Sequence, residues 1–264
     1  MRESMWRQIA EDLRLKIESG ELGAGGMPLP SELELRDSYR ASRNTVRDAI
    51  KWLVTRGLVV TRPGQGTFVV QKIDPFVTTL STDINAPRES TAYASEVMAS
   101  SRIPKVSDPR IEIQQASGLT AAELHLQHGT SVVSRHQDRF IDGVPWSFQT
   151  TFYPMRLVEQ GAEWIIRAQD LPTGIVGYIE NVLGIKEVGC RDRFLVRPPD
   201  GAETNFFKLP DDGRISVIET IRTGYDQVGE PLRVTVTTYP ADRNQFVMTA
   251  GKVPAEQTRA LPRG

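Results

Sequence analysis

Arginine and asparagine side chains crowd the start of a predicted helix in the stretch ASRNTVRDAI, residues 41–50. Arg43, Asn44 and Arg47 occupy its first turns, where a helix carries partial positive charge and favours acidic residues. Cations at this end are unfavourable by roughly 0.3–1 kcal/mol unless an anion offsets them. Arginine is the commonest partner of guanine, and asparagine pairs with adenine. The composition of this turn therefore indicates contact with the phosphates and base edges of DNA.

The distribution of charge supports this interpretation. The 264 residues have a net charge of −1, but residues 1–72 hold 12 Lys and Arg against 9 Asp and Glu, a local net charge of +3. Between residues 39 and 62 there are six basic residues and a single acid, Asp48. A phosphate backbone responds to such a local excess rather than to the average. The alternative is a basic helix face that is simply solvated.

The elements that position these side chains follow from hydrophobic spacing and capping residues. Apolar residues at helical spacing predict a first helix over 5–19. Ser31 and Glu34 form the pattern of a capping box for a second helix, and a third over 42–56 is capped by the serine at its start. Two β-rich runs joined by PGQG, residues 63–66, predict a hairpin. This order is typical of a winged helix-turn-helix, whose last helix enters the major groove of DNA.

The motifs LPSE, SRNTVRDA and GQGTFV, in this order, make residues 6–70 resemble the GntR family of bacterial regulators. Leu33 is a departure, because many members carry a basic residue there that can contact DNA; the sequence leaves open whether this chain loses that contact. Glycines in the predicted wing let a bare backbone approach DNA closely. The DNA-binding surface that the resemblance implies consists of Ser42, Arg43, Asn44, Thr45 and Arg47 on the helix, and Arg62, Gly64, Gln65 and Gly66 on the wing.

The second half of the chain has a different character, with strands and short helices. Turn signals at Asp142-Gly143 and Val228-Gly229 predict two hairpins, and a short helix is expected to begin at Thr173. This mixture predicts an α+β domain with an antiparallel sheet, and the whole chain a multi-domain α+β protein. The expected domain plan is a DNA-binding domain over 1–72, a linker over 73–90, a ligand-binding and dimerisation domain over 91–250, and a tail over 251–264.

Four segments of this half together resemble the UTRA domain, the chorismate-lyase-like effector module of the HutC branch of the GntR family. They are RFIDGVP (139–145), IENVLGI (179–185), IRTGYDQVGEPL (221–232) and TTYPADRNQF (237–246). In relatives the pocket lies between these strands and the short helix, and several bind sugar phosphates or carboxylates. The effector-binding residues that the resemblance implies are Gln137, Arg139, Gln149, Gly174, Ile175, Arg233, Thr235 and Tyr239.

Strand parity gives an independent reason to expect a site here, because three predicted strands each present a row of polar side chains on one face. The alternative is that those faces are simply exposed to water. Gln149 and Arg233 stand where relatives often have acids, and Gly174 where a serine often begins the helix, so an amino-sugar phosphate is a poor fit. Arginines and the amides of a helix start suit an anion. We therefore expect an effector that carries a carboxylate or phosphate.

Enzymatic activity is the principal alternative, because the effector fold is shared with a lyase. The three histidines are His125, His128 and His136, and the first two have a spacing that can place two metal ligands on one helix face, but no third ligand cluster accompanies that pair. Surface histidines are the favoured interpretation. The sequence shows no nucleophile elbow or phosphate loop, so neither a cofactor nor a metal is expected, and the protein is predicted not to be an enzyme.

Compartment and assembly follow from weaker signals. The start of the chain mixes acids and bases unlike a signal peptide, and no apolar run is long enough to span a bilayer, so neither export nor a membrane partner is expected. The single cysteine, Cys190, suits a reducing cytoplasm and is expected to be an ordinary packing residue. One winged helix covers little DNA, so we expect a homodimer on a double-stranded operator with inverted repeats. A second domain that only dimerises is a further alternative.

Overall fold

The computed structural model describes residues 4–22, 26–70, 75–80, 89–210 and 213–248. The chain divides into two compact units, Met1–Asp74 and Pro75–Gly264. The fold class is therefore the predicted multi-domain α+β arrangement, with a winged helix in the first unit and a mostly antiparallel sheet in the second.

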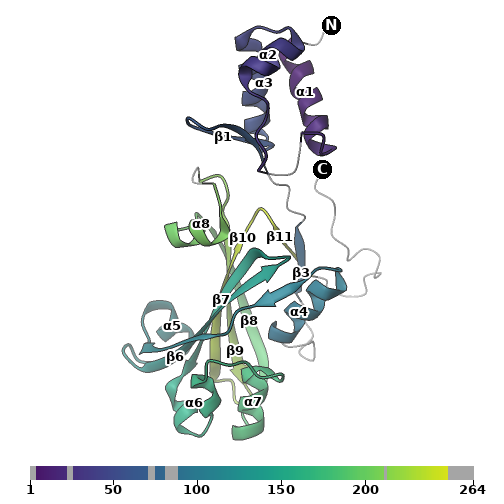
Figure 1. Ribbon diagram of the computed structural model, residues 1–264. Coiled ribbons are helices and arrows are strands. Elements are labelled where there is room, and N and C mark those ends of the chain that lie inside the picture. Colours follow the sequence, from purple (N-terminus) through teal and green to yellow (C-terminus); the bar gives the residue numbers. More distant parts are fainter. Residues whose placement is uncertain (1–3, 23–25, 71–74, 81–88, 211–212, 249–264) are drawn as a thin grey trace. The chain divides into compact units, whose positions relative to one another are not determined.

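The first unit has three helices and a two-stranded wing (Figure 1). Its elements are α1 (Met5–Glu18), α2 (Glu32–Tyr39), α3 (Arg43–Thr55), β1 (Val59–Arg62) and β2 (Gly66–Val69). The predicted capping box is present, because the Ser31 hydroxyl accepts a hydrogen bond from the Glu34 amide and the Glu34 carboxylate accepts one from the Ser31 amide. Val46, Ala49, Ile50 and Leu53 form the buried face of α3, as their spacing predicts.

The second unit is built around one large sheet with helices on both faces. Its strands are β3 (Phe76–Leu80), β4 (Pro104–Val106), β5 (Arg110–Gln115), β6 (Ser131–Ile141), β7 (Val144–Pro154), β8 (Glu187–Arg197), β9 (Val217–Asp226), β10 (Pro231–Pro240) and β11 (Asn244–Met248). Its helices are α4 (Glu89–Ala99), α5 (Gly118–Glu123), α6 (Met155–Glu159), the 3-10 helix η1 (Glu163–Ile166), α7 (Gly174–Leu183) and α8 (Gly201–Phe207). The sheet has seven strands in the order β4-β6-β7-β10-β9-β8, with β5 also paired to β6.

Both predicted hairpins of this unit are confirmed. Strands β6 and β7 are antiparallel and joined at Asp142 and Gly143, which both have positive φ, at 52° and 76°. That combination is the one a tight turn needs when it connects two right-twisted strands. Strands β9 and β10 pair in the same way across Val228 and Gly229.

The segment 73–90, expected to be a linker, is partly structured. Residues 76–80 form β3, which pairs in parallel with β11 nearly 170 residues later, Phe76 opposite Asn244. Helix α4 begins at Glu89, also inside the expected linker. Residues 76–80 therefore belong to the second unit. Residues 73–74 and 81–88, together with the expected tail 251–264, lie outside the described residues.

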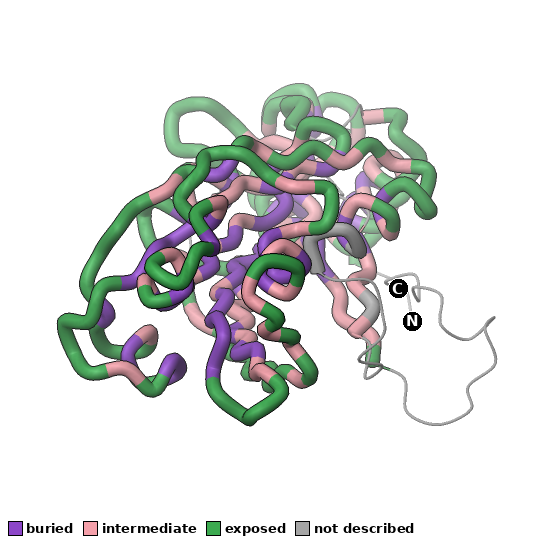
Figure 2. Tube along the Cα trace, turned by 90° about the horizontal axis from the view of Figure 1, so that it is seen from below, coloured by how far each residue is buried: buried purple, intermediate pink, exposed green. Residues whose placement is uncertain are grey.

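Helices cover the two faces of the large sheet at different places. Helix α5 packs on one face, where Ala121 joins Val132 and Val234 in a buried cluster. On the other face Val133 packs against α6, η1 and α7, through residues such as Ile179. Figure 2 shows buried stretches of chain alternating with exposed turns. Figure 1 shows α6 and α7 together at one end of the sheet and α4 beside β3. Between these helices, contacts among the sheet's own side chains fill the faces of the sheet.

One buried acid joins α5 to the far strands of the sheet. The Glu123 side chain is 5% exposed and accepts hydrogen bonds from Arg191 Nη2 at 2.7 Å, from Arg193 Nη2 at 2.8 Å and from the Thr223 hydroxyl. Burial alone would raise the pKa of this carboxyl, but the hydrogen bonds from Thr223 and Arg191 outweigh it and hold the pKa below its ordinary value. The folded chain thus stabilises the ionised form of Glu123 relative to the unfolded chain.

Replacing Glu123 by glutamine should lower the free energy of unfolding at pH 7 by about 2 kcal/mol, because hydrogen bonds to charged groups contribute roughly 1.5–3 kcal/mol and these arginines are half exposed. A depressed carboxyl pKa stabilises the fold above the unfolded value, near 4.3, and this stabilisation is lost as pH falls through the folded value. The loss on acidification should therefore be smaller in Glu123→Gln than in wild type. Urea unfolding at pH 7 and pH 4 measures both effects. The exposed Glu112→Gln is the matched control, and an equal response in the two variants would contradict the assignment.

Candidate DNA-contacting surface and ligand-binding face

The start of α3 is held by its own hydroxyl groups. Ser42 Oγ accepts a hydrogen bond from the Thr45 amide at 3.2 Å and lies 2.8 Å from Thr45 Oγ1. Both hydroxyls are therefore engaged in capping, and their first role is to fix the direction of the helix start. Arg43, Asn44 and Arg47 are exposed around this cap, in keeping with the predicted surface. Leu33 is exposed as well, with 59% of its surface accessible.

Arg43 and Arg47 are oriented by a residue that the sequence did not single out. Glu32, the first residue of α2, lies 3.3 Å from Arg43 Nε and 3.7 Å from Arg47 Nε. The arginine side chains are 70% and 62% exposed, so water screens these pairs and they contribute little to stability. Their consequence is positional, because one carboxylate keeps two guanidinium groups beside each other at the start of the helix.

The tip of the wing contains two glycines, so its backbone is not shielded by side chains there. Gly64 and Gly66 have φ of 72° and 113°, and both are exposed. The Gln65 amide donates to the Arg62 carbonyl at 3.0 Å and closes the turn. The Arg62 guanidinium carbon lies 4.5 Å from the centre of the Phe68 ring, which supports an otherwise flexible side chain. The predicted wing residues therefore gather on one exposed tip.

Arg62→Ala should weaken DNA binding about equally for all sequences, because we expect the wing arginine to contact the phosphate backbone rather than a base edge. The slope of log affinity against log salt should fall by about 1, which corresponds to one lost phosphate contact. Fluorescence anisotropy on selected and on random duplexes over a range of salt concentrations tests this. An unchanged salt slope would remove Arg62 from the DNA surface.

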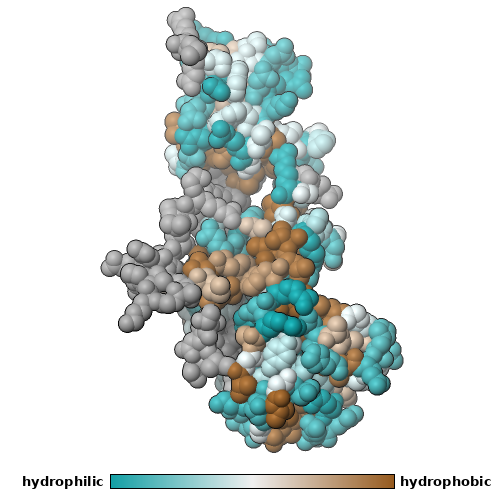
Figure 3. Space-filling model, turned by 180° about the vertical axis from the view of Figure 1, so that it is seen from behind, coloured by the Kyte–Doolittle hydropathy of each residue, from teal (hydrophilic) through white to brown (hydrophobic). Residues whose placement is uncertain are grey.

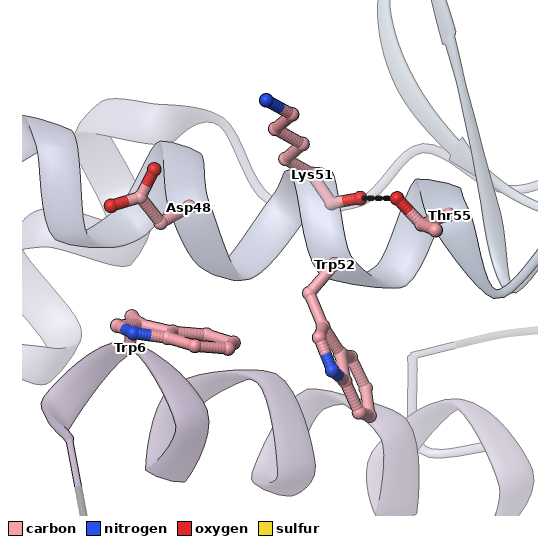
Figure 4. A pocket seen from close by; sticks show the side chains of 5 residues that line it. All are labelled: Trp6, Asp48, Lys51, Trp52 and Thr55. Atoms are coloured by element: carbon pink, nitrogen blue, oxygen red, sulfur yellow. Dashed lines mark hydrogen bonds between the residues drawn. The ribbon is translucent and has the colours of Figure 1, made fainter.

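A shallow pocket of about 360 Å³ lies on the seam between α1 and α3. Figure 4 shows the Trp6 and Trp52 rings between the two helices, with Asp48 of α3 above Trp6 and the Lys51 side chain pointing away from α1. The Thr55 hydroxyl donates to the Lys51 carbonyl at 2.8 Å. This pocket contains no residue of the predicted DNA-binding set.

The predicted polar face of the second unit is one continuous surface. Strand register places Gln137 opposite Gln149 and Gln149 opposite Thr237, while Thr151 stands opposite Thr235. Directly paired residues in antiparallel strands share a face, so the rows deduced for β6, β7 and β10 lie side by side. The predicted sharing of one face by these polar rows is therefore confirmed, and most of the side chains are buried rather than exposed to water.

Three side-chain atoms on this face are buried without any hydrogen-bond partner. They are Ser147 Oγ, Gln149 Oε1 and Thr237 Oγ1. Ser147 and Thr237 have no exposed surface, and Gln149 is 9% exposed. A buried polar group without a partner costs roughly 1–3 kcal/mol, so folded proteins retain few of them. Three on neighbouring positions of one face indicate a place where another molecule supplies the missing partners.

Arg139 stands at the same place. It is opposite Ser147 in the register and 4% exposed, and its guanidinium carbon lies 4.9 Å from the centre of the Tyr93 ring. Within the ranges that the structure describes, its guanidinium has no ion pair and no hydrogen bond. A buried cation of this kind favours an anionic ligand.

The other cation predicted for the site is engaged elsewhere. Arg233 donates to both oxygens of Glu187, at 2.8 and 3.0 Å, and to Thr235 Oγ1 at 2.6 Å. Its charge is therefore neutralised within the chain. The expectation that Arg233 offers a free guanidinium to an anion is wrong, because β8 brings an acid beside it.

Arg135, which was not among the predicted site residues, fastens a loop across the polar face. It donates to the carbonyls of Ile165, Arg167 and Gln169, at 2.6–2.9 Å, and to Asp170 at 3.1 Å. Gln137, a predicted site residue, donates to the same Asp170 carboxylate at 2.7 Å. The loop between η1 and α7 is therefore tied to β6. Backbone acceptors have no sequence signature, so spacing could not reveal this role.

The start of α7 contributes less to an anion site than expected. The Gly174 amide donates to the Leu171 carbonyl at 2.8 Å, and the Ile175 side chain packs in the hydrophobic core with Leu232. Tyr239 is 7% exposed and packs edge-on against Phe246, with ring centres 5.0 Å apart. The described contacts of Gly174 and Ile175 are therefore with the loop before α7 and with the hydrophobic core.

The histidines lie outside this face. Helix α5 ends at Glu123, so His125 and His128 do not share a helix face. His136 contacts Thr150 Oγ1 at 2.8 Å and Asp138 Oδ1 at 3.1 Å on the opposite side of the sheet, beside a pocket of about 250 Å³. No group of three His, Cys, Asp or Glu side chains that could hold a metal ion occurs among the described residues. Within the same ranges, no helix is long and apolar enough to cross a membrane.

Comparisons with known proteins agree with this division of the chain. Residues 6–69 match the family described as bacterial regulatory proteins, gntR family, and residues 102–245 match the UTRA domain. An uncharacterized HTH-type transcriptional regulator of Rhizobium meliloti is 27% identical over 91% of this chain and 92% of its own length. The HTH-type transcriptional repressor NagR of Bacillus subtilis is 25% identical over 92% of this chain and 93% of its own.

Solved structures show the same fold. A crystal structure of a GntR-family transcriptional regulator superposes with a TM-score of 0.61 and 22% identity, covering 95% of this chain and 99% of the other. PhnF from Mycobacterium smegmatis gives a TM-score of 0.55 and 20% identity, covering 92% and 99%. The two family matches identify a winged-helix DNA-binding transcriptional regulator with a second, effector-type domain. The chain belongs to the GntR family and carries a UTRA domain.

Proposed function

We propose that this regulator is a repressor that binds an inverted-repeat operator as a homodimer and releases it when the second unit binds a small anionic molecule. The observation that carries the proposal is the group of partnerless buried atoms, Ser147 Oγ, Gln149 Oε1 and Thr237 Oγ1, beside the buried guanidinium of Arg139. Such a group lowers the stability of the domain when no ligand is bound, and a ligand that supplies the missing hydrogen bonds removes this cost. A relative of similar length, NagR, is named a repressor, which supports the sign of regulation.

The chemistry of the face restricts the ligand. Arg139 supplies one guanidinium for a carboxylate or a phosphate. Gln149 Oε1 is an acceptor and needs a donor, while the Ser147 and Thr237 hydroxyls can donate or accept. A small molecule with one acidic group and neighbouring hydroxyl or amide groups fits this set. The residues proposed to bind it are Gln137, Arg139, Ser147, Gln149, Thr235, Thr237 and Tyr239, with Gly174 and Ile175 at the border.

The division of labour between the two units also belongs to the proposal. Residues 1–72 bind DNA in the cytoplasm, and the unit that begins at Pro75 binds the effector and holds two chains together. A single winged helix reads only one half-site, so two copies on an inverted repeat are needed for tight and specific binding. Ligand binding changes the relative placement of the two DNA-binding units and thus the fit to both half-sites.

The test begins with the full-length protein and DNA duplexes selected from a random library. Thermal unfolding is measured with a panel of sugar phosphates, sugar acids and small carboxylates, since a bound ligand at one hundred times its Kd stabilises by about 2.7 kcal/mol. Compounds that stabilise the protein are then titrated into the protein–DNA complex. Stabilisation together with DNA release supports the proposal. DNA binding without any response to the panel supports a second domain that only dimerises. Conversion of a bound compound into a product, detected by mass spectrometry, supports an enzyme.

A further inference from the structure

Glu187 of β8 and Arg233 of β10 form an ion pair although a third strand, β9, lies between them. Neighbouring strands are about 4.8 Å apart, so these two backbones are separated by roughly 10 Å. The Glu187 carboxylate nevertheless accepts hydrogen bonds from Arg233 Nε at 2.8 Å and Nη2 at 3.0 Å. Figure 3 shows hydrophilic residues over much of the visible surface, whereas these two side chains are only 17% and 8% exposed. The glutamate side chain therefore crosses β9 within the protein to reach its partner.

Gly224 of β9 leaves the space for this crossing. It stands opposite Arg233 in β10 and opposite Cys190 in β8. Cys190 is exposed at this point, so the expectation that it is an ordinary packing residue is wrong. A Cβ atom at position 224 would overlap the Glu187 carboxylate. Glycine within a strand often marks the close approach of another group, and here that group is the end of the Glu187 side chain.

Two irregularities in the strand pairing adjoin the same contact. The β8–β9 register shifts between Glu187 and Gly189, and the β9–β10 register shifts between Pro231 and Arg233. An extra residue in one strand changes the direction of the side chains next to it, and such bulges are frequent beside functional sites. Two bulges and one glycine therefore converge on a single ion pair.

The other end of Arg233 belongs to the proposed ligand-binding face. Its Nη1 donates to Thr235 Oγ1 at 2.6 Å, and Thr235 Oγ1 lies 3.0 Å from Thr151 Oγ1. Gln149 Nε2 donates to the same Thr151 oxygen at 3.4 Å, while Gln149 Oε1 is one of the three buried atoms without a partner. The charge of Arg233 is thus two hydroxyl groups away from the proposed ligand. Any change in that charge alters the electrostatic potential at the ligand, because screening is weak between buried groups.

The ion pair leaves one cation of this face without an acidic partner. Strand register places four arginines on the face, and three of them are paired within the described chain: Arg135 with Asp170, Arg222 with Asp192, and Arg233 with Glu187. The fourth is Arg139. A carboxylate has one negative charge, whereas a phosphate monoester carries about −1.5 to −2 at pH 7. One guanidinium balances the carboxylate but leaves the phosphate with excess charge, which is unfavourable in a buried site.

We propose that Glu187 is a specificity-determining residue: by neutralising Arg233, it makes this face select a ligand with a carboxylate over the same molecule with a phosphate. The inference rests on the proposed function, which leaves the acidic group open between these two. The partnerless atoms of Ser147, Gln149 and Thr237 require hydrogen-bonding groups beside the carboxylate. The ligand class is therefore a hydroxylated carboxylic acid, such as a sugar acid.

The test uses matched probes with full-length protein: glucuronate and galacturonate against the corresponding hexose 6-phosphates, and glycerate against glycerol phosphate. Calorimetric titration gives the two dissociation constants of each pair. Wild type should bind the carboxylate at least about 10-fold more tightly, because the second charge of the phosphate has no partner. Glu187→Gln keeps the size of the side chain and frees the charge of Arg233, so it should raise the phosphate-to-carboxylate affinity ratio by about 10-fold or more.

Further variants separate the effect of charge from structural damage, which lowers the affinity for both members of a pair. The double variant Glu187→Gln, Arg233→Gln removes both charges and should restore the wild-type ratio. Gly224→Ala keeps both charges but displaces the Glu187 carboxylate, so the ratio should shift as in Glu187→Gln. Glu219→Gln is the matched control, because Glu219 is 20% exposed and pairs with Arg197 on the opposite face of the same sheet. It should leave the ratio unchanged, and thermal unfolding verifies that each variant is folded.

The outcomes distinguish this inference from the proposed function. A wild type that prefers the phosphates, or a wild-type ratio in Glu187→Gln, overturns the role of Glu187; if that variant does not fold, a wild-type ratio in Gly224→Ala does so. Either result leaves the proposed function standing if the compounds still release DNA. Carboxylates that bind with the expected preference but release no DNA refute the proposed function and leave the role of Glu187 standing. A wild type that binds no probe of any pair overturns both.

Discussion

Replacing Arg43 or Arg47 by alanine is expected to weaken binding to a selected operator by about 5- to 150-fold for each substitution. This range corresponds to the ~1–3 kcal/mol that a base-reading arginine contributes. Both side chains are largely exposed at the start of α3, and Glu32 holds them beside each other. Because they make no buried contact, the free energy of unfolding should change little.

The measurement is a titration of full-length protein against selected and random duplexes at one fixed salt concentration. Loss of a base contact lowers the affinity for the selected duplex more than for the random one, whereas loss of charge alone lowers both. Arg56→Ala is the control, because Arg56 is an exposed arginine at the opposite end of the same helix, stacked 4.1 Å from the centre of the Trp52 ring. Selected-operator affinity equal to wild type in both Arg43→Ala and Arg47→Ala would rule out this docking of α3.

The parts of the fold that the sequence predicts are those determined by residues close together in the chain. Ser31 and Glu34 cap α2 across three positions, and Asp142-Gly143 sets the β6–β7 turn. Each signal needs only a few residues to act, so it can be recognised without knowing the fold. The faces of β6 and β7 follow from the same hairpin, since register and side-chain alternation are fixed once the turn is known.

The parts that the sequence does not predict depend on contacts between distant segments. Strand β3 pairs with β11, and nothing near Phe76 marks Asn244 as its partner. Arg233 finds Glu187 only because the sheet order places β9 between their two strands. The pairing of Arg135 uses backbone carbonyls, which every residue carries. Long-range pairing of this kind is decided by the whole fold.

Arg139→Ala is expected to prevent release of the operator at effector concentrations that just saturate wild type, while leaving operator binding intact. Among the arginines of this face, Arg233 is neutralised by Glu187 and Arg135 is saturated by the loop before α7. Arg139 is the one whose guanidinium has no ion pair or hydrogen bond within the described part of the chain, and it is 4% exposed. A charge-assisted pair at this position contributes roughly 1.5–3 kcal/mol, so the apparent affinity for an anionic effector should fall about 10- to 150-fold.

The exchange Arg233→Glu, which would restore an acid common at this position in relatives, is not a clean test of the ligand. The new glutamate would lie beside another carboxylate, because the Glu187 oxygens lie within about 3 Å of the Arg233 guanidinium. Repulsion between buried acids destabilises the sheet whether or not a ligand binds there. Arg139→Lys is more informative, since it keeps the charge and removes the planar pair of donors that grips a carboxylate or phosphate.

Operator release is therefore measured with a compound taken from the thermal-shift panel, in wild type, Arg139→Ala, Arg139→Lys and Arg110→Ala. Arg110 is 67% exposed on β5 and pairs with Asp138. Asp138 contacts His136 on the side of the sheet opposite to Arg139. The Arg110→Ala variant therefore controls for the loss of one positive charge away from the proposed site. If Arg139 binds the acidic group, then at effector concentrations that just saturate wild type the lysine variant should respond weakly, the alanine variant not at all, and the Arg110 variant like wild type. A full response in Arg139→Ala would mean that the buried guanidinium only stacks on Tyr93. The anion would then have to bind away from Ser147, Gln149 and Thr237.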